Sequence, residues 1–246
     1  MKWTRFILMP LYRLWFYLLI GIPIIVLAPF LTVFTISKKT YPQFFKVAQI
    51  WAYIIVYGMC WKPIIYRDAG MIKGQSYMLV ANHTSMLDIM LMLIVAKNPF
   101  VFVGKASLAK IPIFGFFYKR SCILVDRSDA HSRQAVFKRA SDRLDAGVGI
   151  CIFPEGGVPD DRSIVLDNFK DGAFRLAIEH QIPVVPISFY DNKKRLPFAF
   201  FHGSLGRMRA RTHEIQETAG LQLPGDKVRF RESVRTIILN DLLKYQ

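Results

Sequence analysis

Cysteines and acidic residues are both scarce in this sequence. The three cysteines, Cys60, Cys122 and Cys151, lie far apart and form no C-x-x-C pair. They cannot make an even set of disulfides, so we expect small buried thiols in a reducing compartment. A zinc-finger spacing, an RNP-like run and an evident recognition helix are also missing. The excess of positive charge therefore does not predict a nucleic-acid-binding protein.

Positive charge and apolar residues are both abundant. The 246 residues carry 33 Lys and Arg against 18 Asp and Glu, a formal net charge of +15. Nine of the basic residues but a single acid, Asp68, lie within residues 1–73. Hydrophobic residues make up 52% of the chain, which is high for a soluble domain. A segment that is both basic and apolar suits an anionic lipid surface, so we predict membrane lipids as partners.

Two long apolar runs open the sequence. The 23 residues 14–36 contain no charged side chain, and a helix needs about 20 residues to cross a bilayer. Gly21, Pro23 and Pro29 lie within this run, and the prolines are expected to bend or interrupt its helix. The second run, residues 44–61, carries aromatic side chains that suit the headgroup level of a membrane.

The two runs allow three arrangements. They can form a pair of spanning helices, or a helical hairpin that dips into one leaflet. Basic residues flank both ends of the first run, and this favours the dipped hairpin under the positive-inside rule. Alternatively, residues 44–61 form a core helix that packs on the domain. We predict an N-terminal membrane-embedded helical hairpin in residues 1–61, followed by one domain in residues 62–246.

From residue 62 onward, short apolar runs alternate with helical ones. Strands are predicted at 63–67, 77–81, 100–105, 122–126, 149–153 and 183–189, with an edge strand at 207–213. Helices are predicted at 85–97, 130–147 and 172–181, and within 228–243. This alternation predicts an α/β fold with a mostly parallel central sheet flanked by helices.

The stretch LVANHTSMLDIMLMLIV places His83 and Asp88 at the break between a predicted strand and a predicted helix. Ligands of α/β sheets bind beyond the carboxyl ends of strands. One interpretation is structural: Ser85 and Asp88 form a capping box, and His83 is a turn residue. The other is catalytic: Asp88 accepts a hydrogen bond from one imidazole nitrogen, and the other nitrogen takes a proton. Because no G-x-S-x-G elbow is present, the pair would activate a substrate hydroxyl directly.

Polar residues follow three other predicted strands. Lys105 ends one strand and Arg127 follows another, and a cation at such a place is a suitable phosphate ligand. Glu155 and Gly156 follow strand 149–153; a glutamate there can bind hydroxyls, and glycines let the backbone approach a ligand closely. The alternatives are surface cations and a turn with a solvated acid. The shared position after strands favours a common rim with His83.

Four ordered blocks, NHTSMLD, ILVDR, FPEGG…FKDGAF and VVPI, resemble those of the glycerolipid acyltransferase family, especially its 1-acylglycerol-3-phosphate O-acyltransferases. The resemblance covers roughly residues 60–215. It implies that His83 is the general base and that Asp88 orients it. It implies that Arg127, helped by Lys105, binds the phosphate of the acceptor. Glu155 and Gly156 would shape the acceptor site, and the VVPI block would help form the acyl-chain region.

The sequence departs from the family pattern in two places. Gly157 and Val158 replace the hydroxyl and basic positions that usually end the third block. Cys122 stands where the second block usually carries a glycine. The first departure leaves the acceptor headgroup open, because a family member that acylates a different lipid would share the same catalytic residues.

The resemblance implies transfer of a fatty acyl group from acyl-CoA or acyl carrier protein to the sn-2 hydroxyl of 1-acylglycerol-3-phosphate. The product is phosphatidic acid, an intermediate of phospholipid biosynthesis. Backbone amides near the start of helix 85–97 would stabilise the oxyanion. No metal or bound cofactor is expected, and the expected location is the cytoplasmic face of a bacterial inner membrane. The alternatives are O-acylation of another single-chain lipid such as an N-acyl amino acid lipid, a non-catalytic lipid-binding membrane protein, and a lipase.

Overall fold

The computed structural model describes residues 2–68, 70–126, 129–159, 161 and 163–245. The chain forms two compact units. The first comprises Met1–Tyr66, Thr84–Ala96 and Phe189–Ala210, and the second comprises Arg67–His83, Lys97–Ser188 and Arg211–Gln246. The first unit begins with the N-terminal helices and also takes in later segments. The domain boundary after residue 61 stays a prediction.

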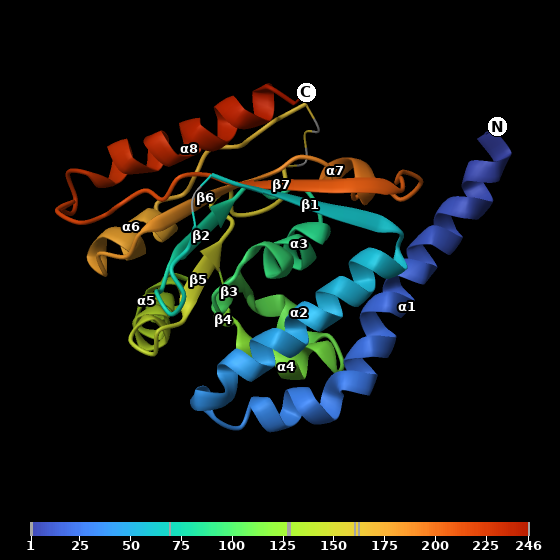
Figure 1. Cartoon of the computed structure of the whole chain (residues 1–246), viewed down its shortest axis with the longest axis horizontal. Helices are drawn as coiled ribbons and strands as arrows, with labels where there is room; N and C mark the ends of the chain where they lie inside the picture. Colours follow the sequence, from blue (N-terminus) through green and yellow to red (C-terminus); the bar gives the residue numbers. More distant parts are fainter. Residues whose placement is uncertain (1, 69, 127–128, 160, 162, 246) are drawn as a thin grey trace. The chain divides into compact units, whose positions relative to one another are not determined.

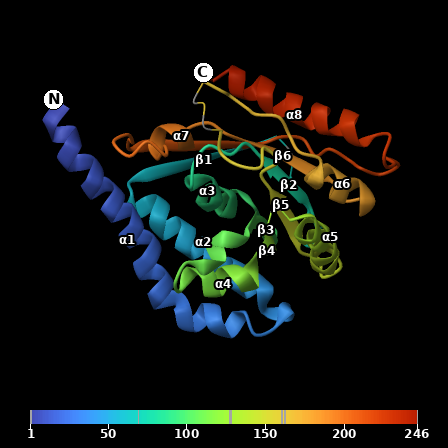
Figure 2. The same cartoon turned by 180° about the vertical axis from the view of Figure 1, so that it is seen from behind.

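The first unit is mostly helical. Its elements are α1 (Lys2–Phe34), the 3-10 helix η1 (Lys38–Thr40), α2 (Tyr41–Gly58), β1 (Trp61–Arg67, whose last residue belongs to the second unit), α3 (Leu87–Val95), α7 (Asn192–Arg195) and most of β7 (Gly206–Thr212). Figure 1 and Figure 2 show α1 and α2 lying side by side as a helical hairpin. The indole N–H of Trp15 donates to the carbonyl of Gly58 at 2.9 Å. A Cβ at Gly58 would lie 2.8 Å from Leu19, so glycine permits this close approach.

Helix α1 is continuous although Pro10, Pro23 and Pro29 lie inside it. Of the two expected outcomes, bending is the one observed, and the bend is visible in Figure 1. A proline removes one backbone hydrogen bond and displaces the chain, while the neighbouring turns keep the helix together. The segment Arg5–Phe34 is long and apolar enough to cross a membrane by length and composition, and only 17% of its most apolar stretch is buried.

Helix α2 has an inner and an outer face. The inner face packs on α1 and α3, and the carboxamide of Gln49 donates to the carbonyls of Leu93 and Ala96. These bonds satisfy acceptors at the C-terminal end of α3 that have no partner within the helix. The outer face exposes Ile50 and Tyr57. The core-helix alternative thus describes the inner face, whereas the outer face keeps an apolar surface of the kind that suits a membrane.

The second unit contains the parallel sheet. Its elements are β2 (Met78–Ala81), β3 (Phe100–Lys105), the 3-10 helix η2 (Ala106–Lys110), α4 (Phe114–Ser121), β4 (Ile123–Val125), α5 (Ala130–Leu144), β5 (Gly149–Ile152), α6 (Gly172–Glu179), most of β6 (Val184–Phe189) and α8 (Lys227–Leu243). The pairs β6–β2, β2–β5, β5–β3 and β3–β4 are all parallel. Helix α5 packs on β4 and β5, α6 packs on β2, and α6 and α8 lie side by side (Figure 1, Figure 2). The predicted α/β fold is confirmed, although the sequence patterns did not predict α4.

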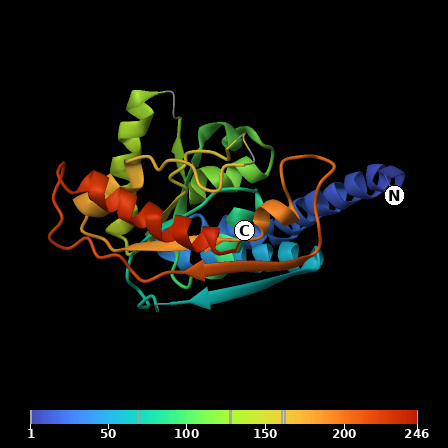
Figure 3. The same cartoon turned by 90° about the horizontal axis from the view of Figure 1, so that it is seen from above.

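Strand β7 is not the edge strand that the sequence pattern predicted. The hydrogen-bonded strands follow the order β1-β7-β6-β2-β5-β3-β4, and Figure 3 shows β1 alongside β7. The N–H of His213 donates to the carbonyl of Pro186, and the N–H of Tyr190 donates to that of Arg209. These partners place β7 antiparallel to β6 and leave β1 at the edge. A pattern within one strand cannot reveal that β1, far earlier in the chain, covers its outer side.

The cysteines divide into two kinds. Cys151 is buried and Cys122 is half-buried; burial raises the pKa of the Cys151 thiol well above its usual range and that of Cys122 to about 12. Cys60 is exposed, so the expectation of a buried thiol is wrong there. It lies in the tight turn between α2 and β1 with a φ of 56°, and this turn leaves its side chain at the surface.

Candidate active site

Three of the predicted site positions lie at one edge of the sheet in the second unit. His83 follows β2, Glu155 follows β5, and Lys105 ends β3. Because these strands are parallel neighbours in the order β2-β5-β3, their carboxyl ends meet at the same edge. The common rim expected from the sequence is therefore present for these three. Arg127 lies outside the described residues.

The imidazole of His83 is half-buried and rests on an aromatic side chain. Its ring stacks on Phe153 with 4.4 Å between ring centroids and 15° between planes. Phe153 in turn lies nearly parallel to Phe102 of β3, with the centroids 6.3 Å apart. Packing against one ring face limits the orientations of an imidazole while its edge nitrogens stay clear of that stack. The side chain is thus held in place and remains partly accessible.

Glu155 holds the backbone around His83. One carboxylate oxygen accepts the N–H of His83 at 2.6 Å, and the other accepts the N–H of Asp167 at 2.9 Å. The residue is only 6% exposed, so the alternative of a solvated acid in a turn is wrong. Hydrogen bonds to an ionised acceptor are about twice as strong as neutral ones. Glu155 therefore ties the turn after β5 to the turn after β2, and its contact with a substrate hydroxyl stays a prediction.

In the first unit, Asp88 organises the turn that directly follows His83 in the chain. Its Oδ2 accepts the N–H groups of Thr84 and Ser85 at 2.6 and 2.9 Å. The hydroxyl of Ser85 accepts the N–H of Leu87 at 3.2 Å. These are the reciprocal contacts of the capping-box interpretation, although the helix begins at Leu87. That the Asp88 carboxylate also orients the imidazole of His83 stays a prediction.

Three amides near the start of α3 are already engaged. Those of Thr84 and Ser85 donate to Asp88, and that of Leu87 donates to Ser85. They are therefore poorly suited to the oxyanion role expected from the sequence. The hydroxyl of Ser85 donates to the carbonyl of Leu196 at 2.6 Å and is fully buried. These contacts make Ser85 a structural residue.

Two polar groups of the first unit were missed in the sequence. The carboxamide of Asn192 donates to Oδ1 of Asp88 at 2.7 Å and so completes the cradle of that carboxylate. Within the described part of the chain, Oδ1 of Asn192 and the hydroxyl of Thr84 are buried without a hydrogen-bond partner. Such atoms are suited to a substrate or water contact. The available signal for Asn192 was its place in a pair of polar residues shortly after the buried strand β6. His83 was identified from a similar pair after β2.

A further cation was missed beside the glycine turn of the second unit. Gly156 has a φ of 81°, and a Cβ there would lie 2.5 Å from Nζ of Lys170. The N–H of Lys170 donates to the carbonyl of Pro154 at 2.8 Å, so this exposed lysine is anchored next to the turn. Lys170 belongs to the block FKDGAF, and its position within that block was the available signal. It joins Lys105 as a candidate phosphate ligand.

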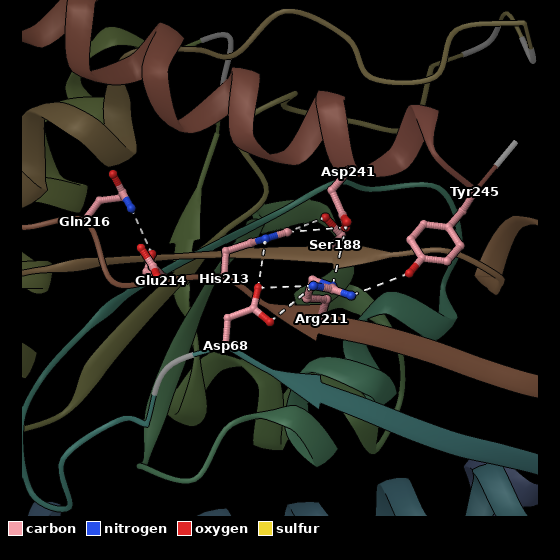
Figure 4. A network of polar contacts seen from close by, with 8 residues as sticks. All are labelled: Asp68, Ser188, Arg211, His213, Glu214, Gln216, Asp241 and Tyr245. Carbon is pink, nitrogen blue, oxygen red and sulfur yellow. Dashed lines mark hydrogen bonds and ion pairs between the residues drawn. The ribbon is translucent and has the colours of Figure 1, made fainter.

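The second unit contains another polar cluster, which resembles a catalytic triad in composition (Figure 4). Nε2 of His213 lies 2.8 Å from the hydroxyl of Ser188. Two carboxylates lie near the ring. Nδ1 of His213 is 3.7 Å from Oδ2 of Asp68, and Nε2 is 3.5 Å from Oδ2 of Asp241. Ser188 has no exposed surface, so no substrate can reach it. Burial lowers the pKa of His213 despite the two carboxylates, which favours a neutral imidazole.

Comparisons with known proteins agree with the blocks in the sequence. A family model described as Acyltransferase matches residues 64–190. A chloroplastic 1-acyl-sn-glycerol-3-phosphate acyltransferase of Arabidopsis thaliana is 30% identical over 170 residues, which are 69% of this chain and 46% of that protein. The alpha form of a 1-acyl-sn-glycerol-3-phosphate acyltransferase of Mus musculus is 31% identical over 180 residues, 67% of this chain and 58% of that protein. The chain thus spans about half the length of such relatives.

A solved structure resembles nearly the whole chain. The crystal structure of a 1-acyl-sn-glycerophosphate acyltransferase from Thermotoga maritima aligns with a TM-score of 0.80. The alignment covers 98% of this chain and 97% of the other, at 21% sequence identity. At this sequence identity, the structural similarity is evidence for the fold alone.

Proposed function

This chain belongs to the acyltransferase family, and we propose that it transfers a fatty acyl group from an acyl thioester to the sn-2 hydroxyl of a 1-acylglycerol-3-phosphate. The observation that carries the proposal is the setting of His83. Its imidazole lies at the carboxyl end of β2, stacked on Phe153 and partly accessible. Its backbone is held by a buried glutamate. A general base needs this combination of fixed position and access.

In the proposed reaction, His83 removes the proton of the sn-2 hydroxyl as the oxygen attacks the thioester carbonyl. The tetrahedral intermediate then collapses, the C–S bond breaks, and the protonated imidazole returns its proton to the departing thiolate. Asp88 would hold the imidazole in the reactive tautomer. Because Asp88 is buried and cradled by Asn192, Thr84 and Ser85, its carboxylate has a fixed orientation.

The acceptor phosphate is assigned to the cations at the rim. Lys105, at the end of β3, and Lys170, in the loop after the neighbouring strand β5, are both exposed. Arg127 is the phosphate ligand that the family resemblance implies. Glu155 and Gly156 would shape the site around the glycerol. The replacement of the usual hydroxyl and basic positions by Gly157 and Val158 supports one rival acceptor class, a single-chain lipid without a phosphate. The donor is a substrate, acyl-CoA or acyl carrier protein, and the proposal requires no bound cofactor.

In this proposal the two substrates, which both carry apolar acyl chains, reach the protein at the membrane. Helix α1 is long and apolar enough to associate with a bilayer, and the net charge of +15 suits an anionic leaflet. We place the protein at the cytoplasmic face of a bacterial inner membrane, where basic flanking residues accumulate.

The decisive experiment measures thiol release from acyl-CoA and from acyl carrier protein with a panel of acceptors. Lysophosphatidate, a monoacyl amino lipid and water are compared for the wild type, His83→Ala and the exposed surface control His131→Ala. We expect release with lysophosphatidate, a loss of about 10²- to 10⁴-fold in His83→Ala, and no change in His131→Ala. Near-normal turnover of His83→Ala would refute the mechanism. Preference for the amino lipid would change the acceptor, water-dependent release of fatty acid from a lipid would indicate a lipase, and lipid binding without thiol release would indicate a non-catalytic protein.

A further inference from the structure

The loop of residues 196–205, between α7 and β7 in the first unit, exposes aromatic rings. Phe198 is 60% exposed and Phe200 is 51% exposed, and Phe201 and Leu205 are also at the surface. Such large apolar side chains on one short loop form an unusual surface for contact with water. The question is what covers them.

This loop is firmly attached to α1 by Arg13, which is only 6% exposed. The guanidinium of Arg13 donates to the carbonyls of four loop residues, Pro197, Ala199, Phe200 and His202. The hydroxyl of Tyr12 lies 2.8 Å from the carbonyl of Arg195 and 3.1 Å from that of Ser204. Tyr12 and Arg13 of α1 therefore hold the loop in one conformation, so the exposure of its rings does not result from a loose segment.

The same contacts also pair backbone carbonyls that would otherwise be unpaired in a bilayer. Backbone carbonyls that lose water without gaining a partner make irregular segments unfavourable in a lipid environment. In this loop the buried Arg13 satisfies four such carbonyls, and the indole N–H of Trp61 donates to a fifth, that of Ser204, at 3.0 Å. The loop presents apolar rings outward while these five backbone acceptors are paired inward.

The surroundings of the loop are continuous with the apolar surface of α1 and carry one sign of charge. The ring of Phe201 lies 4.9 Å from that of Phe6 on α1, centroid to centroid, and the neighbouring Ile7 is exposed. From residue 192 to residue 213 the sequence contains no acid but six basic residues, of which Lys194 and Arg207 are exposed. Aromatic and basic side chains together are typical of segments that lie in the interface of an anionic membrane.

We propose that residues 197–205 form a second membrane-binding element, which inserts Phe198 and Phe200 into the headgroup boundary of an anionic bilayer while Arg13 fixes it to α1. This element goes beyond the acyl-transfer proposal and does not depend on it. The hairpin would then have a companion from a distant part of the sequence, and the two would contact the same leaflet.

The test places a fluorescent label on the loop. In a Cys60→Ser background, Phe198→Cys or Phe200→Cys carries an environment-sensitive thiol dye; burial raises the pKa of Cys122 and Cys151, which lowers the reactivity of those thiols. Val228→Cys on α8, an exposed apolar position, is the matched control. The full chain is mixed with vesicles of phosphatidylcholine and phosphatidylglycerol that contain lipids brominated at shallow or deep acyl positions.

We expect a blue shift and quenching by the shallow bromines at both loop positions, with a depth of about 5–10 Å below the headgroup boundary, and neither effect at Val228→Cys. Loop labels that stay in water when the protein is bound to vesicles would overturn the proposal. A blue shift without vesicles that grows with protein concentration would also overturn it, since the loop would then contact a second copy of the chain. Because the readout is depth, failure here leaves the thiol-release result unaffected.

Discussion

Two histidines of the second unit lie near hydroxyl or carboxylate groups, yet their surroundings differ. His83 lies at the end of a strand, half-buried, with one ring face on Phe153 and its backbone held by Glu155. His213 is only 7% exposed and lies 2.8 Å from a fully buried serine. The second group has the composition of a hydrolase triad and lacks access for a substrate. The difference teaches that access, more than composition, separates a candidate base from a structural histidine.

The largest expected effect breaks the comparison on the side of His83. His83→Ala removes the proposed base and should lower turnover by about 10²- to 10⁴-fold, while the fold is retained because the side chain is half-buried and stacked on a single ring. The measurement is initial-rate thiol release together with circular dichroism. The matched change His213→Ala should keep turnover per folded molecule. Equal losses in the two variants would contradict the distinction.

A second prediction concerns the support of the His83 turn. Glu155→Gln replaces an acceptor of two backbone N–H groups with a side chain whose NH₂ group faces one of them. We expect a loss of about 1–3 kcal/mol in the free energy of unfolding and lower turnover, because the His83 turn shifts. Denaturant unfolding and thiol release measure both. Glu179→Gln, an exposed glutamate on α6, is the control and should change stability by less than about 0.5 kcal/mol.

A third prediction sharpens the structural side. The cluster around His213 joins Ser188 of β6, Asp68 after β1, and Asp241 of α8. His213→Ala leaves a buried hydroxyl without its imidazole partner, so the free energy of unfolding should fall by about 1–3 kcal/mol. Denaturant unfolding checks this value. An unchanged midpoint would mean that the cluster contributes little to holding α8.

The smallest effect is a dependence of stability on pH. Burial lowers the pKa of His213 below its usual value of 6.5; Asp241 and Asp68 oppose this shift, and Arg211 and Lys244 add to it. Below pH 6.5 the unfolded chain therefore binds a proton that the folded protein resists, and stability should fall by up to about 1.4 kcal/mol per pH unit until the folded pKa is reached.

The matched variant His213→Gln isolates this contribution. In this variant the additional fall in the free energy of unfolding between pH 6.5 and the lower folded pKa of His213 should be absent. The contributions of the other titratable groups should remain. The check is the difference in unfolding free energy between the wild type and the variant at pH 7.5 and pH 5.5. A wild type that gains stability relative to the variant on acidification would reverse the sign and refute the prediction.

Most strands could be predicted from the sequence because each is a short apolar run bounded by polar residues or glycine. The strand Phe100–Lys105 was predicted with its observed bounds. Helix α4 was missed because its sequence, FGFFYKRS, is short and has three aromatic residues in series, a pattern that fits a strand equally well. The edge position of β7 was wrong because pairing with β1 depends on residues about 140 positions earlier in the chain.

The sequence by itself determined the alternation of strands and helices, the polar residues after each strand, and the block order that identifies the family. These features are local: each depends on the side chains of a few consecutive residues. Only the tertiary structure decided that Asn192 cradles Asp88, that Lys170 lies beside Gly156, that Arg13 binds a loop near residue 200, and that Ser188 is closed to substrate. The physical reason is that burial and hydrogen-bond partners arise between segments distant in the chain, and no spacing within the sequence encodes them.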